Sequence, residues 1–128
     1  MALYAQSSGT QQTNSSTFVP IPGLSITIPE GVGSSAVLIL NVPNPYAQGN
    51  NFPGGVFGVS VNGTISPVQA VFTYNESQPQ STGRVPTTLV VSVPLSQKGA
   101  QVVLGVWSGV RGSNVIIDTP ATLTAIID

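Results

Sequence analysis

Hydrogen-bonding side chains are concentrated in one stretch, where Phe72-Thr73-Tyr74 is followed, across a proline-containing loop, by Ser81-Thr82-Gly83-Arg84. This stretch combines aromatic rings, hydroxyl groups and a guanidinium. A sugar presents an apolar ring face edged by hydroxyls, which aromatic rings can cover and which arginine and Ser/Thr side chains can hydrogen-bond. The stretch therefore predicts a sugar-binding site centred on Arg84, with a surface loop carrying an incidental charge as the alternative.

Arg111 is the other arginine of the sequence, and these two account for two of its seven charged residues. It lies in the segment SGVRGS at 108–113, whose glycines make a hairpin tip an equally good interpretation. Asp118, seven residues later, is a candidate ion-pair partner for Arg111. Tyr46, in Asn44-Pro45-Tyr46, is by default a turn residue and otherwise a ring on which a sugar stacks.

The inventory of catalytic side chains is poor. The sequence has no histidine and no cysteine, which excludes disulfides, thiolate nucleophiles and zinc sites built on those ligands. Its four acids, Glu30, Glu76, Asp118 and Asp128, lie in separate segments, whereas acid–base catalysis near neutral pH uses histidine or paired carboxylates. The glycine-rich stretches 29–33 and 49–55 lack the Lys-Ser/Thr ending of a phosphate loop. We therefore expect no enzyme, no metal ion and no other cofactor.

The composition narrows the possible partners. The 128 residues are 41% hydrophobic and 5% charged, with a net charge of −1. Nucleic-acid binding needs several lysines and arginines together, so that class is excluded. No stretch approaches the roughly 18 apolar residues that span a bilayer, and residues 1–16 do not resemble a signal peptide. We expect a protein made in soluble form, with its localisation left open, and the low charge favours an oligomer.

The pattern of apolar residues predicts an all-β fold. Glycine and proline make up about a fifth of the chain, and the apolar runs are short and bounded by turn residues. We predict a jelly-roll β-sandwich in a single domain of residues 1–128, with residues 1–17 as a polar N-terminal arm or edge strand. The predicted strands are 24–28, 37–42, 56–61, 68–74, 88–93, 102–107, 115–119 and 121–127.

Three features sharpen this expectation. Asn62-Gly63 predicts a two-residue hairpin turn. The nearly continuous apolar run 37–42 predicts a strand buried on both faces. Trp107, at the end of a predicted strand, is expected in the core or at a subunit interface.

Several blocks of the sequence together resemble a known family. They are IPGLSI at 21–26, ILNVPNPYAQGNNFPGG at 39–55, FTYNESQPQSTGRVP at 72–86, WSGVRGS at 107–113 and IDTPATLTAI at 117–126. From about Phe18 to Ile127 the chain is similar to the TNF-like, fucose-binding lectin domain that forms the N-terminal half of a Burkholderia two-domain superlectin. The resemblance implies a TNF-like jelly roll that forms a homotrimer and binds fucosylated oligosaccharides, without a metal ion, in pockets between protomers.

The resemblance also implies a set of site residues. By motif they are Tyr46, Thr73, Tyr74, Ser81, Thr82, Arg84 and Arg111, with Asp118 and Thr119 in a segment close to the pocket. Val56 stands where the family has a tyrosine, which removes one aromatic hydroxyl and implies weaker fucose binding or a change in the linked sugars accepted. The calcium chemistry of the superlectin's second domain is not implied for these residues.

Two other functions remain open at this level. One is a structural trimerisation head of the TNF or C1q type without a sugar ligand, and the other is a lectin whose sugar specificity is altered by Val56. The polar cluster of Tyr74, Ser81, Thr82 and Arg84 favours a lectin, because a purely structural head does not need it.

Overall fold

The computed structural model describes residues 1–96 and 98–128. These residues form twelve strands and no helix, which confirms the all-β class. The strands are β1 (Ala2–Gln6), β2 (Gln11–Thr13), β3 (Val19–Ile28), β4 (Ser35–Val42), β5 (Tyr46–Gln48), β6 (Gly54–Val61), β7 (Thr64–Ile65), β8 (Ala70–Thr73), β9 (Thr87–Pro94), β10 (Gln101–Val110), β11 (Asn114–Ile117) and β12 (Thr122–Ile127).

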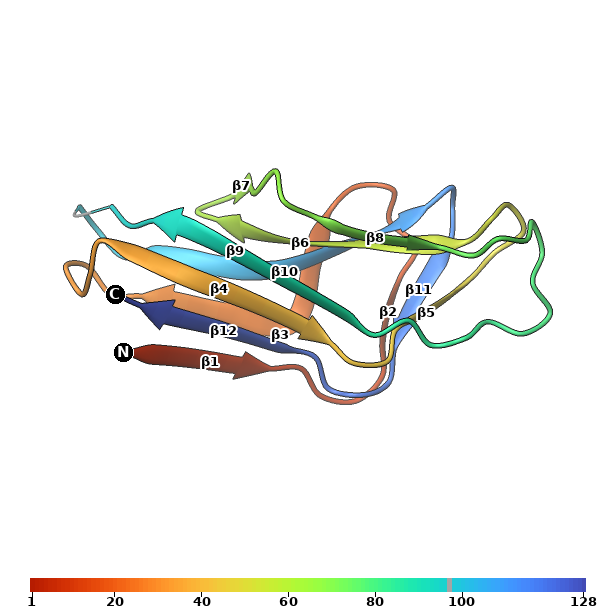
Figure 1. Cartoon of the computed structure of the whole chain (residues 1–128), viewed down its shortest axis with the longest axis horizontal. Helices are drawn as coiled ribbons and strands as arrows, with labels where there is room; N and C mark the ends of the chain where they lie inside the picture. Colours follow the sequence, from red (N-terminus) through yellow and green to blue (C-terminus); the bar gives the residue numbers. More distant parts are fainter. Residues whose placement is uncertain (97) are drawn as a thin grey trace.

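Two antiparallel sheets pack face to face as a sandwich (Figure 1). One has the order β1-β12-β4-β9, and the other has the order β3-β10-β6-β7, with β8 also paired to β6. The chain passes repeatedly from one sheet to the other, so that the eight main strands are arranged as in a jelly roll. All eight predicted strands are present, with bounds that differ by a few residues.

A third, smaller sheet is formed entirely by connections between the two large ones. Its order is β2-β11-β5, and these strands lie in the β1–β3, β10–β12 and β4–β6 connections, respectively. In Figure 1 they lie together toward the end of the sandwich far from the two termini, on the same side as the connection between β8 and β9. A hydrogen bond of 2.9 Å from the Val85 N–H to the Pro45 carbonyl joins that connection to the start of β5. This end of the molecule therefore brings together segments that are far apart in the sequence.

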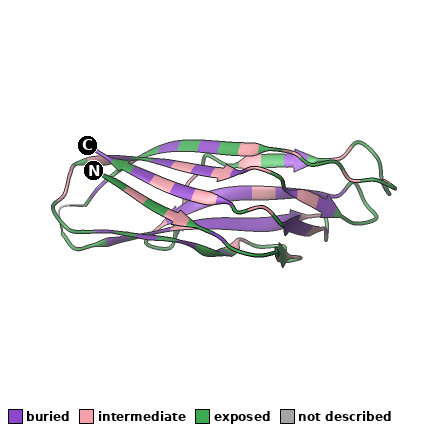
Figure 2. Cartoon of the chain, turned by 90° about the horizontal axis from the view of Figure 1, so that it is seen from below, coloured by how far each residue is buried: buried purple, intermediate pink, exposed green. Residues whose placement is uncertain are grey.

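The core lies between the two large sheets, and buried and exposed residues alternate along several strands (Figure 2). Trp107 is 1% exposed and packs near Phe57, with ring centroids 6.3 Å apart, so its prediction as a core residue is confirmed. The prediction that 37–42 is buried on both faces is wrong. Leu38 and Leu40 are buried, but Val37 is 36% exposed, because β4 turns its other face to the outside of its sheet.

The predicted turn at Asn62-Gly63 is confirmed as the connection between β6 and β7. Both residues have positive φ angles, 49° and 83°, as the two-residue turn of a tight hairpin requires. The Asn62 side-chain oxygen also accepts a 2.8 Å hydrogen bond from the Val102 N–H. The β6–β7 hairpin is therefore hydrogen-bonded to β10 through the Asn62 side chain, in addition to the pairing between β6 and β7.

The apolar pattern does not predict β5 and β7, whereas β1 and β2 lie within residues 1–17, for which an edge strand is one of the two predicted alternatives. Strand β1 pairs with β12 and β2 pairs with β11, each at the edge of its sheet. β2 (QQT), β5 (YAQ) and β7 (TI) have three residues or fewer, so none is long enough to show a period. Neighbouring strands rather than their own apolar residues determine their conformation.

Candidate functional site

Arg84 is held on three sides at the end where the third sheet lies. Its Nη1 and Nη2 groups donate to the two carboxylate oxygens of Asp118 at 2.7 and 2.9 Å, and Nη1 also donates to the Asn44 carbonyl at 3.1 Å. The guanidinium carbon lies 4.2 Å from the centre of the Tyr46 ring, a cation–π geometry. Tyr46 begins β5 and Asp118 follows β11, so two strands of the small sheet position the arginine.

These contacts leave part of the guanidinium without a partner. A guanidinium has five N–H donors in a fixed plane, and Asp118 and Asn44 occupy three of them. The Nε–H and the second Nη2–H, which point the same way along one edge of that plane, donate to none of the described residues. Arg84 therefore presents a pair of parallel donors to solvent, and its side chain is 44% exposed. This pair fits two neighbouring acceptors such as vicinal hydroxyl oxygens.

Asp118 supplies the matching acceptors. Its ion pair with Arg84 lowers the pKa of the Asp118 carboxyl below its ordinary value, chiefly through the hydrogen bond from the guanidinium, and raises that of Arg84. An ionised carboxylate has about four lone-pair sites, of which Arg84 fills two. The pairing of Asp118 with Arg111 considered from the sequence is wrong, because the fold brings the end of β11 to the β8–β9 connection instead.

Tyr74 acts inside the structure rather than at its surface. Its hydroxyl accepts a 3.2 Å hydrogen bond from the Ala47 N–H and donates one of 2.6 Å to the Gly83 carbonyl. Burial raises the pKa of this phenol, opposed by hydrogen bonds that include one with the Thr82 side chain. Tyr74 and Thr82 therefore fix the Ser81–Arg84 segment against β5, and this use of the Tyr74 hydroxyl was not foreseen from the sequence.

Two hydroxyls, those of Thr119 and Ser81, border the Arg84 side chain or its loop and have unused hydrogen-bonding capacity. Thr119 Oγ1 accepts a 3.2 Å hydrogen bond from the Asn44 side chain, which leaves the threonine proton available. Ser81 is exposed, and its side chain hydrogen-bonds to no described residue. The sequence does not identify Asn44 as a residue of this site, because its contact with Arg84 is made by a backbone carbonyl.

Arg111 lies in a separate group. It and Gly112 form the turn between β10 and β11, with φ angles of 50° and 75°, so the hairpin interpretation describes its backbone correctly. Its side chain donates to the carbonyls of Asn51 and Phe52 and lies 5.9 Å from the centre of the Phe52 ring. Phe52 also has a positive φ, of 46°, and such conformations in residues other than glycine are uncommon and cluster at functional sites.

Thr73 and Val56 belong to the same side of the molecule as Arg111. Thr73 pairs with Gly54, which also pairs with Val110, the residue before Arg111. Val56 lies two residues after Gly54 on β6, so it faces the same outer side of the five-stranded sheet, and it is half-buried. The structure thus divides the predicted residues between two surfaces. We call Tyr46, Tyr74, Ser81, Thr82, Arg84, Asp118 and Thr119 the Arg84 group, and Thr73, Val56 and Arg111 the Arg111 group.

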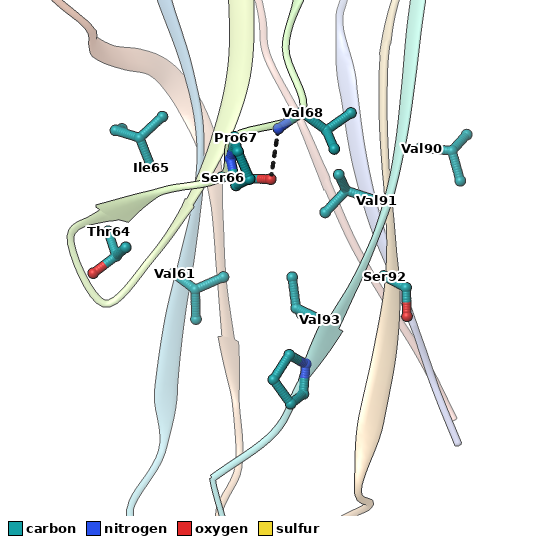
Figure 3. A pocket seen from close by; sticks show the side chains of 11 residues that line it. Val61, Thr64, Ile65, Ser66, Pro67, Val68, Val90, Val91, Ser92 and Val93 are labelled. Carbon is teal, nitrogen blue, oxygen red and sulfur yellow. Dashed lines mark hydrogen bonds between the residues drawn. The ribbon is translucent and has the colours of Figure 1, made fainter.

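A different hollow, of about 480 Å³, lies at the open edge of the sandwich between β7, with the loop after it, and β9. Figure 3 shows that valine, isoleucine and proline side chains dominate its lining, among them Val61, Ile65 and Val93. Hydroxyls are its only polar side chains, and it contains none of the predicted site residues. Its chemistry suits an apolar contact rather than a sugar.

Residues 1–96 and 98–128 hold no group of three or more acidic, histidine or cysteine residues placed to bind a metal ion. They also have no helix of the length and apolarity needed to cross a membrane.

Comparison with known proteins identifies the family. Residues 8–126 match the family described as the Bc2l-C N-terminal domain. The chain belongs to this family. No curated protein matches it. The family is the lectin family that the sequence motifs resemble, so the chain is a carbohydrate-binding protein of the lectin type, and its family points away from an enzyme.

Solved structures similar to this Bc2l-C-like domain are distant in sequence. Latent PorU from Porphyromonas gingivalis is 14% identical with a TM-score of 0.47, and the match covers 95% of this chain but only 13% of that one. The C-terminal domain of EclA, a sugar-binding protein, is 10% identical with a TM-score of 0.44, covering 91% and 78% of the two chains. The Eiger TNF of S. frugiperda is 9% identical with a TM-score of 0.34, covering 99% and 92%.

Proposed function

We propose that this domain is a lectin that binds fucosylated oligosaccharides, without a metal ion, in pockets between the protomers of a homotrimer. The observation that carries the proposal is the arrangement around Arg84. Two parallel N–H donors face solvent there, beside the carboxylate of Asp118 and the ring of Tyr46. A sugar hydroxyl both donates and accepts, so it can use the guanidinium and the carboxylate together.

The division of the site residues supports a pocket between chains. The Arg84 group lies around the third sheet and the β8–β9 connection, whereas the Arg111 group lies on the outer face of the five-stranded sheet. The side-chain hydrogen bonds of Arg84 and Arg111 share no residue. A ligand that uses both arginines is therefore best accommodated where the Arg84 group of one protomer meets the Arg111 group of its neighbour.

The outer face of the four-stranded sheet supports assembly. It exposes Tyr4, Val37, Val90 and Ile126, and the side chains between them, such as Thr124 and Ile39, are uncharged. Apolar surface of this kind marks an interaction site on a soluble protein. In a ring of three protomers each chain contributes two different surfaces to its contacts, which agrees with a site divided between two surfaces.

The test combines a glycan array with titration of the strongest glycan into three variants. We expect binding to fucosylated glycans, and we expect Arg84→Ala to weaken it by about tenfold or more, since a hydrogen bond to a charged group is lost. Arg84→Lys should be nearly as weak, because lysine keeps the charge but not the two parallel donors.

Lys98→Ala is the matched control, since it removes an exposed cation outside both groups and should leave affinity unchanged. An array on which no glycan is bound would instead favour a structural trimerisation head. Binding confined to glycans without fucose would favour a sugar specificity altered by Val56.

A further inference from the structure

A row of amide side chains crosses the outer face of the third sheet. Asn114 pairs with Gln48 across β11 and β5, and Ile116 pairs with Gln12 across β11 and β2. Continuing this register one residue beyond the last pair, Thr13 with Val115, places Asn14 opposite Asn114. Asn14, Asn114, Gln48 and Gln12 therefore lie on one face, and we call them the amide row. Gln12, Asn14 and Asn114 line a shallow hollow of about 460 Å³.

The amide row has unused hydrogen-bonding capacity. Its one internal bond runs from Asn114 Nδ2 to Gln12 Oε1 at 2.9 Å. The side-chain amides of Asn14 and Gln48 bond to none of the residues that the structure describes. Each amide offers two donors and an acceptor, and none of the four residues is charged. Such a surface matches a neutral ligand rich in hydroxyls, which can donate to and accept from the amides.

The row is continuous with the Arg84 group. Tyr46 and Gln48 lie two residues apart on the same face of β5, which corresponds to about 7 Å. Asn114 and Asp118 lie four residues apart along β11 and the residue after it, about 13 Å. Between them Ile116 is 6% exposed although it is not part of the core cluster, so it forms an apolar floor on the outer side. A single sugar does not extend over this distance, whereas a linked chain of sugars does.

We propose that the amide row is a second subsite, which binds the sugars linked to the fucose that the Arg84 group holds. This inference rests on the proposed function, because it assigns the rest of the oligosaccharide to a surface next to the same site. Its ligands are neutral sugar residues, recognised through their hydroxyls by side-chain amides, with Ile116 beneath them.

The test compares free L-fucose with a fucose-terminated trisaccharide by calorimetric titration of the full chain. We expect the trisaccharide to bind the unaltered protein more tightly than fucose does. The double variant Asn14→Ala, Gln48→Ala should bind fucose with unchanged affinity but the trisaccharide about five- to tenfold more weakly, through the loss of two hydrogen bonds. Folding should be intact, because neither side chain bonds to a described residue. The second double variant, Asn14→Asp with Gln48→Glu, keeps the shapes of the two side chains but replaces their NH2 donors with carboxylate oxygens. It should weaken trisaccharide binding in the same way.

Gln69→Ala is the control, since Gln69 is an exposed amide on the loop before β8. If the double variant binds both ligands like the unaltered protein, or if the trisaccharide binds no tighter than fucose, the second subsite does not exist and the lectin function stands. If the variant loses fucose as well, the amide row belongs to the first site. If the unaltered protein binds neither ligand, the proposed function itself is wrong.

Discussion

Arg84 has its position fixed before any ligand arrives. Asp118 and Asn44 engage one end of the guanidinium and Tyr46 one face, so its two outward N–H groups have a set direction. A side chain already ordered in this way loses little conformational entropy on binding. The same residues therefore hold the arginine and shape the surface at which we propose that a sugar binds.

Asp118 determines how binding depends on pH. Its pKa is lowered by the hydrogen bond from Arg84, so the ion pair is fully present above the ordinary aspartate pKa of about 3.9 and is lost as the pH falls through the lower value of the folded protein. We expect glycan affinity to be constant from neutral pH to about pH 5 and to fall only in stronger acid. Titrations across this range measure it.

Asp118→Asn is the companion variant for the pH series. It removes the carboxylate, so its weaker binding should no longer respond to acid in the same range. A decline in the glycan affinity of the unaltered protein already between pH 7 and 6 would contradict this assignment, because the pKa of Asp118 lies below its ordinary value.

The hydroxyl of Tyr74 joins the Ser81–Arg84 loop to β5. Tyr74→Phe removes the bonds to Ala47 and Gly83 and should lower the free energy of unfolding by about 1 kcal/mol, with a loss of glycan affinity as the Arg84 loop loosens. Chemical denaturation and titration measure the two effects. Tyr4→Phe is the control, since the Tyr4 hydroxyl bonds only to Gln6 on the same strand, and equal effects of the two variants would refute the role of Tyr74.

At the scale of single residues, the sequence indicates candidates better than partners. Arg84, Thr82 and Tyr74 lie within eleven positions of each other, so their association is visible in the order of the chain. The ion-pair partner of Asp118 is not visible in this way, because the short sequence separation points to Arg111, whereas the path of β11 places Asp118 beside Arg84. Asn44 contributes a carbonyl, which every residue has, so no side-chain pattern can reveal it.

At the scale of elements, the connections rather than the main strands build the site. The strands of the two large sheets are predictable from apolar runs, since each buries one face in the core. β2 and β5 are three residues long and partly polar. They are strands because β11 lies between them, and that neighbourhood follows from the jelly-roll topology rather than from local sequence.

Strands β6 and β8 lie in close contact at Gly54. A Cβ on Gly54 would overlap the carbonyl oxygen of Phe72 on the paired strand, so Gly54→Ala must separate the two strands. We expect the free energy of unfolding to fall by about 1–3 kcal/mol, as measured by thermal or chemical denaturation. Gly83→Ala is the control and should leave the free energy of unfolding nearly unchanged, because a Cβ there meets no atom within 4 Å. Equal stability of the two variants would show that β8 can move away from β6 at no cost, which would contradict the prediction.

At the scale of the whole molecule, assembly and binding should be linked. Individual sugar sites are commonly weak, and several sites on one particle gain apparent affinity for a glycan-covered surface without new contacts. The uncharged outer face of the four-stranded sheet is the surface that we expect to be covered in the trimer.

Val37→Lys tests that expectation. A lysine placed in the middle of the exposed apolar side chains should dissociate the trimer, because its charge would be buried without a partner. Sedimentation or light scattering should then give the mass of a monomer, and binding to a glycan-coated surface should fall. Val102→Lys, an exposed valine on the other large sheet, should remain trimeric, and a monomeric unaltered protein would refute the assembly itself.

The two ends of the chain lie side by side, joined by a 2.8 Å hydrogen bond from the Ile127 N–H to the Met1 carbonyl, and the β8–β9 connection lies at the opposite end of the sandwich (Figure 1). A tether attached to either terminus would therefore extend away from the Arg84 loop. A protein attached to a chip or bead by such a tether would present the Arg84 loop away from the support. All molecules of the layer would then have the orientation needed to capture glycan-bearing cells.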